Sequence, residues 1–142
     1  CAAFPEAKII HIRRDPRATC WSNFKHYFPA KGLGYSYDLC DLVKYYKLYG
    51  DLMRFWHQHL SNLIYDLDYD ALTNNQEEET RFLIEHIGLD WDDACLSPEN
   101  NKRVAKTASQ QQVQKKVYRN SSQEWLKFDK FLDGEFDKLH SF

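Results

Sequence analysis

The chain has 142 residues, and its 19 Lys and Arg against 21 Asp and Glu give a formal net charge of -2. This length suits one compact domain, and 43% apolar with 28% charged residues excludes intrinsic disorder and a fibrous fold. The charge balance excludes an overall basic field for nucleic acid, and no apolar run approaches the roughly 20 residues that cross a membrane. We therefore expect no nucleic-acid or membrane partner. Four scattered cysteines favour a reducing, cytoplasmic compartment.

The first predicted unit is a strand, a tight turn and a helix. Residues 8–13, KIIHIR, form a β-branched run of strand length that we expect to be buried. Asp15 is placed to cap the following helix, Pro16 suits its first position, and residues 18–28 continue it. Residues 29–36 contain Pro and two Gly without an apolar period, which predicts a loop.

A helix over residues 38–60 is the clearest periodic prediction. Its apolar positions recur three or four residues apart, at Leu39, Leu42, Val43, Tyr46, Met53, Trp56 and Leu60. A second strand is predicted over residues 62–69, and two strands joined through a long helix imply a parallel βαβ unit. Residues 76–87 predict a further amphipathic helix that ends at Gly88.

The last third of the chain combines a polar connection with an apolar tail. Residues 97–112 are polar and are predicted to form a long loop, which composition leaves open as functional or disordered. Residues 121–139 return to the apolar period of a helix, with a break near Gly134.

A cluster of arginines at the first strand-to-helix turn indicates a candidate anion site. Residues 13–17 read RRDPR, and a helix N-terminus offers N–H groups and a positive dipole end. An Arg guanidinium suits two phosphate oxygens, and Ser22 lies two turns along the same helix, so one phosphate could meet Arg14 and Ser22. The alternative on spacing alone is a solvated turn whose arginines pair with nearby carboxylates.

The segment IIHIRRDPRATCWSNF resembles the 3′-phosphate-binding segment of the sulfotransferases, in which a Ser follows the Arg of an R-D-P turn by eight residues. The resemblance implies that Arg14 and Ser22 hold the 3′-phosphate of the sulfuryl donor, 3′-phosphoadenosine 5′-phosphosulfate. YSYDL, KYYKLY and LMRFW are similar to the long helix of bacterial sulfotransferase domains that follow tetratricopeptide repeats. DYDAL resembles a strand-end motif of these domains and puts Tyr69 beside the nucleotide.

A late loop extends the resemblance to about residues 4–132. TASQQQV is similar to the family's T-A-S-x-x-Q-V-R loop, which closes over the donor, and implies that Ser109 contacts the donor. Gln114 stands where this loop has Arg, and Lys115 is expected to supply positive charge to the donor in its place. The implied fold is α/β and P-loop-NTPase-like, with short parallel strands and a predominance of helices. The family's 5′-phosphosulfate loop and catalytic base lie upstream of R-D-P and have no counterpart here. Residues 1–142 are therefore expected to be the truncated C-terminal portion of a single sulfotransferase domain.

The implied activity of the complete enzyme is sulfuryl transfer to a hydroxyl or amine acceptor that the sequence does not identify. We expect this chain to hold the 3′-phosphoadenosine half of the donor, to contain no catalytic residue and not to catalyse transfer alone. The alternative is a non-catalytic helical interaction module, favoured by Gln114 and Glu124, which stand where the family has basic residues.

Two further expectations concern partners and metals. A truncated sheet edge predicts self-association as a homo-oligomer. No metal is expected, because His57 and His59 are two positions apart on a helix and face different directions.

Overall fold

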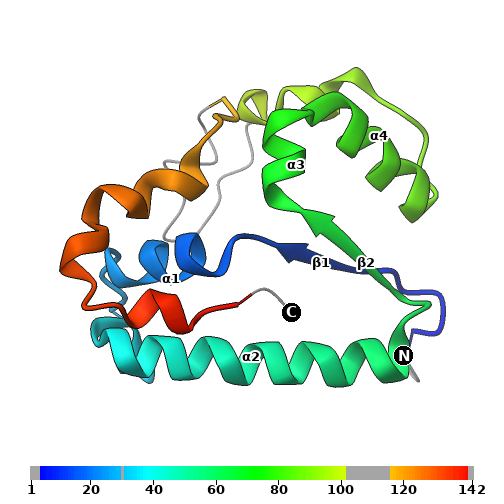
Figure 1. Cartoon of the computed structure of the whole chain (residues 1–142). Coiled ribbons are helices and arrows are strands. Elements are labelled where there is room, and N and C mark those ends of the chain that lie inside the picture. The colour runs from blue at the N-terminus through cyan, green and yellow to red at the C-terminus, as the bar shows by residue number, and fades with distance from the viewer. Residues whose placement is uncertain (1–3, 30, 102–115, 141–142) are drawn as a thin grey trace. The chain divides into compact units, whose positions relative to one another are not determined.

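The structure is a computed structural model that describes residues 4–29, 31–101 and 116–140. Its α-helices and β-strands, labelled in Figure 1, are β1 (Ile9–Arg13), α1 (Pro16–Phe24), α2 (Leu39–Leu60), β2 (Ile64–Asp68), α3 (Tyr69–Asn74) and α4 (Gln76–Ile87). The 3₁₀ segments are η1 (Gly34–Tyr37), η2 (Asp93–Leu96), η3 (Pro98–Asn100), η4 (Ser121–Phe131) and η5 (Glu135–Lys138).

The chain divides into two compact units. The first unit contains Cys1–Ile9, Arg14–Ile64 and Asn120–Phe142, and the second contains Ile10–Arg13 and Tyr65–Arg119. The first unit therefore holds α1, α2 and the C-terminal 3₁₀ segments, whereas the second holds α3, α4 and most of both strands. No helix within the described ranges is long and apolar enough to cross a membrane.

The two strands form a small parallel sheet, as the βαβ pattern predicted. The prediction that the first strand is buried is wrong, because Ile10 and Ile12 of β1 are 40% and 57% exposed. In a sheet of two strands β1 has a single neighbour, and the side chains on its uncovered face remain in solvent. Self-association through a sheet edge stays a prediction.

Helix α1 begins where the sequence predicts and ends earlier. Asp15 Oδ1 accepts a hydrogen bond from the Ala18 N–H at 2.8 Å, and Pro16 occupies the first turn. The helix ends at Phe24 rather than at residue 28. The Tyr37 hydroxyl accepts from the N–H of Phe28 and donates to its carbonyl oxygen, both at 2.9 Å. A tertiary contact thus replaces the helical hydrogen bonds of Phe28.

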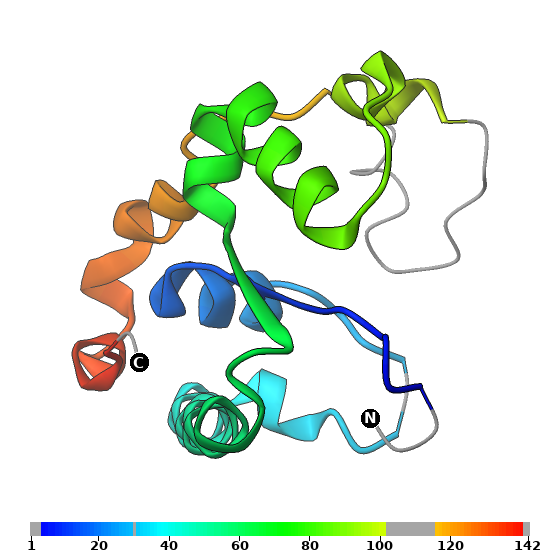
Figure 2. The ribbon, with the colours of Figure 1, turned by 90° about the vertical axis from the view of Figure 1, so that its right-hand side faces the viewer.

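The core of the first unit joins α1, α2 and the C-terminal tail (residues 120–140). Helix α2 confirms the predicted periodic helix, and Asp38 caps it by accepting from the Asp41 N–H at 2.9 Å. The tail forms two 3₁₀ segments, and the predicted break is confirmed at Gly134, whose φ is +68°. Figure 2 views α2 nearly along its axis, with the red η5 beside it. The buried cluster consists of Cys20, Leu42, Val43, Leu132, Phe136 and Leu139.

The second unit contains one predicted helix and one that was missed. Helix α4 matches its predicted bounds and ends at Gly88, which adopts the left-handed conformation with φ +76°. Helix α3 was not predicted, and it begins because Asp68 Oδ1 accepts from the N–H groups of Asp70 and Ala71 at 2.8 Å. The Arg119 guanidinium bonds to the Asn74 carbonyl oxygen at 3.0 Å.

The buried thiol of Cys20 makes the stability of the core depend on pH. Burial, reinforced by the nearby charge of Asp15, raises the pKa of its thiol from 9.0 to about 12. Below pH 9 the thiol is neutral in both the folded and unfolded chain. As the pH rises from 9 toward 12, the thiol ionises in the unfolded chain before it ionises in the folded chain. The free energy of unfolding therefore falls over this pH range.

We therefore expect the urea midpoint of the wild type to fall more steeply above pH 9 than that of Cys20→Ala. Cys40→Ala, which removes an exposed thiol, serves as the control and should keep the wild-type slope. Equal slopes for the wild type and Cys20→Ala would contradict the burial argument.

Candidate anion-binding site

Arg14 lies between β1 and α1, and the tail holds its side chain. Its Nε donates to Ser122 Oγ at 3.0 Å, and its Nη2 donates to Ser121 Oγ at 3.1 Å. Both serines begin η4, more than 100 positions along the chain. One guanidinium and two hydroxyls thus gather in the first unit. Because a hydroxyl hydrogen can rotate, all three groups are able to donate to an oxyanion.

The N-terminus of α1 itself is already occupied by its own cap. The Asp15 carboxylate takes the Ala18 N–H, and Pro16 has no N–H to offer. The Asp15 charge also opposes a second anion at this position. The Ala18 N–H is therefore engaged by the predicted cap and is not available to an anion. The donors of the candidate site are side chains.

Ser22 offers a further hydroxyl on α1. Its carbonyl oxygen lies 3.1 Å from His26 Nδ1. The hydroxyl itself bonds to no other group in the part of the chain that the structure describes. Ser22 is half-buried, so its hydroxyl remains available to a ligand.

The neighbouring arginines have other contacts. Arg17 Nε donates to the Phe136 carbonyl oxygen at 3.2 Å, and its guanidinium carbon lies 5.3 Å from the ring centroid of Trp125. In the second unit, Arg13 Nη1 lies 3.9 Å from Asp66 Oδ2. The alternative of arginines paired with carboxylates therefore describes Arg13.

An ion pair that sequence reasoning missed attaches η4 to the end of α1. Lys25 Nζ lies 2.5 Å from Glu124 Oε2. Beside it in sequence, the rings of Trp21 and Phe128 stack with centroids 4.5 Å apart. Glu124 stands where the family has a basic residue, and the structure gives it a cationic partner. The signal in the sequence was the opposite charge of the two residues, but nothing local showed that they meet.

The remaining predicted site residues lie in the second unit or outside the described residues. Tyr69 is the first residue of α3 in the second unit and is half-buried. Ser109, Lys115 and Gln114 lie outside the described residues. The assignment of Tyr69, Ser109 and Lys115 to the donor site stays a prediction.

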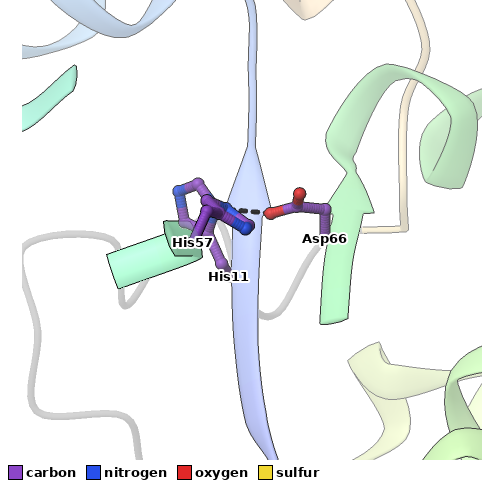
Figure 3. A group of neighbouring side chains, drawn as sticks. All are labelled: His11, His57 and Asp66. Carbon is purple, nitrogen blue, oxygen red and sulfur yellow. Dashed lines mark hydrogen bonds and ion pairs between the residues drawn. The ribbon is translucent and has the colours of Figure 1, made fainter. Parts of the chain in front are cut away.

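A second polar pair that the sequence did not reveal connects the two strands within the second unit. His11 Nδ1 of β1 lies 2.7 Å from Asp66 Oδ1 of β2 (Figure 3), and the His11 side chain is only 9% exposed. Two predicted strands do not fix their register, so the sequence could not place these residues opposite each other. His57, also drawn in Figure 3, belongs to the first unit. The expected absence of a metal stays a prediction.

We expect Asp66→Ala to lower the free energy of unfolding by about 1 kcal/mol, because the buried His11 ring loses a hydrogen-bond partner. Urea unfolding measures the loss. Asp90→Ala is the matched control in the same unit, since Asp90 is exposed and has no hydrogen bond or ion pair with another described residue. A loss no larger than that of the control would show that the pair contributes nothing to stability.

Comparison with known proteins identifies the family of this chain. A family model described as "Sulfotransferase family" matches residues 1–93, which include β1, α1, α2, β2, α3 and α4. An uncharacterized protein of Aquifex aeolicus (strain VF5) is 37% identical over 131 residues, which are 91% of this chain and 17% of that protein. The chain thus spans less than a fifth of that relative. No solved structure matches this chain. The chain belongs to the sulfotransferase family.

Proposed function

We propose that this chain binds the 3′-phosphoadenosine part of 3′-phosphoadenosine 5′-phosphosulfate in a sulfotransferase with a P-loop-NTPase-like fold. The observation that carries the proposal is the Arg14 guanidinium with its two hydroxyl partners, at a position that resembles the family's 3′-phosphate motif. Membership of the family supports sulfotransferase chemistry in general. The parallel β1–β2 pair with helices between the strands is compatible with the proposed fold.

The Arg14 cluster suits a phosphate monoester for two reasons. Such a group carries nearly two negative charges at neutral pH, and a guanidinium can give it two parallel hydrogen bonds. The contacts to Ser121 and Ser122 also restrict the Arg14 side chain before the ligand arrives. Less side-chain entropy is then lost on binding. Ser22 adds a hydroxyl donor from α1.

The role that we assign to these residues is positioning. In a complete sulfotransferase the acceptor hydroxyl or amine attacks the sulfuryl sulfur in line. The bond from sulfur to the bridging phosphate oxygen breaks, and the acceptor proton passes to a base. Transfers of this kind depend on alignment and on stabilisation of charge. Arg14 would contribute binding energy at the 3′-phosphate, away from the reacting sulfur.

The direct test is calorimetric titration with adenosine 3′,5′-bisphosphate at low ionic strength, where a charged site binds most strongly. We expect Arg14→Ala to weaken binding about tenfold or more, because hydrogen bonds to charged groups contribute about 1.5–3 kcal/mol. Arg81→Ala is the matched control, since Arg81 pairs with Glu77 on the exposed surface of α4. The control should bind as the wild type does.

Two further arms make the result specific to the 3′-phosphate. Adenosine 5′-monophosphate lacks that group and should bind more weakly than the bisphosphate to the wild type but equally to Arg14→Ala. Arg14→Lys keeps the charge without the planar fork and should fall between the two. Equal binding of the bisphosphate to the wild type and Arg14→Ala would contradict the proposal. No binding to the wild type would favour the non-catalytic interaction module.

A further inference from the structure

We propose that a basic cavity of the first unit binds a small ligand that carries a phosphate or sulfate group. Its volume is about 260 Å³, and one face of α2 and the tail line it. Its lining includes Lys47, Gly50, Asp51, Arg54, Lys138 and His140. None of them belongs to the Arg14 cluster, so the inference rests on separate observations.

The spacing of residues on α2 places one wall of the cavity. Lys47 and Asp51 are four positions apart, and so are Gly50 and Arg54, which puts these residues on neighbouring rows of one helix face. Segment η5 packs against α2 within the same unit (Figure 2) and brings Lys138 to the cavity. The cavity is therefore formed inside one compact unit.

The charge of the lining favours an anion. Three cations face a single carboxylate, that of Asp51, which pairs with Arg54. Lys138 Nζ lies 2.5 Å from Glu135 Oε1, and Glu135 is not part of the lining. Among the described residues, no acidic group pairs with Lys47. Arg54 and Asp51 are both more than half exposed, and an ion pair at such positions is weak enough for a ligand to replace.

The shape and chemistry of the cavity narrow the ligand class. Gly50 is buried in the lining, and a glycine inside a helix costs about 0.5–1 kcal/mol relative to alanine, while it leaves space beside the backbone. A volume of 260 Å³ lies just below the roughly 300–1,000 Å³ of pockets for drug-sized molecules. The Arg54 fork and two lysines suit a tetrahedral oxyanion. Asp51 can accept hydrogen bonds from hydroxyls, which favours an ester of a small polyol over the free ion.

The test compares glucose 6-phosphate with inorganic phosphate in ¹H–¹⁵N spectra and calorimetry at low ionic strength, with chloride as the reference anion. We expect Lys47→Ala to weaken binding of glucose 6-phosphate about tenfold, since it removes a charge-assisted contact. Lys44→Ala is the matched control, because it deletes the same charge from an exposed position on α2 outside the lining. Lys44→Ala should bind glucose 6-phosphate as tightly as the wild type does, and the ligand should shift the Gly50 amide signal in both proteins.

Each outcome decides the inference. Tighter binding of glucose 6-phosphate than of phosphate supports an ester ligand, and equal binding supports the free oxyanion at the same site. Arg14→Ala should keep this binding even if it loses adenosine 3′,5′-bisphosphate, which separates the cavity from the proposed donor site. No binding to the wild type, or equal losses in Lys47→Ala and Lys44→Ala, would overturn the cavity as a binding site.

Discussion

The attachment of the tail to α1 is the constraint on which the candidate site depends. Arg14 and its two serine partners are separated by more than 100 positions, so their meeting requires the folded first unit. Three other contacts hold the same pair of elements: the Arg17 hydrogen bond to the Phe136 carbonyl, the Lys25–Glu124 ion pair and the Trp21–Phe128 stack. A partly buried guanidinium needs hydrogen-bond acceptors, and the tail supplies them. Folding of the tail therefore orders the anion-binding side chains.

The elements that the sequence predicted correctly are those with a local physical signal. The period of α2, the Asp15 cap and the left-handed Gly88 each lie within a few residues of the structure they determine. The errors have distant causes. Helix α1 stops early because Phe28 bonds to Tyr37, and β1 is exposed because its sheet has only two strands. Within the site, the motif predicted Arg14 and Ser22, but nothing near them predicted the serine hydroxyls of η4.

Glu124 shows why a departure from a family pattern needs its structural partner before it is interpreted. Taken alone, an acid in place of a basic residue removes positive charge from the region and favours a protein without a nucleotide. In the structure Lys25 lies 2.5 Å from that carboxylate, so the pair as a whole is neutral. The ion pair and the Trp21–Phe128 stack both connect α1 to η4, the segment from which Ser121 and Ser122 reach Arg14. The departure is compatible with an anion site that relies on Arg14.

The distribution of charge explains how a chain with a formal net charge of -2 can have two candidate anion sites in one unit. Some of its acids serve local structure away from the candidate site: Asp38 caps α2, and Glu77 pairs with Arg81 along α4. Such acids have little effect on the electrostatic potential at a distant cation, because exposed charges farther apart than about 10 Å are largely screened at ordinary salt. Arg14 bonds to hydroxyls, and Lys47 lies in a cavity where cations outnumber carboxylates. Local placement, rather than net charge, determines where this protein can hold an anion.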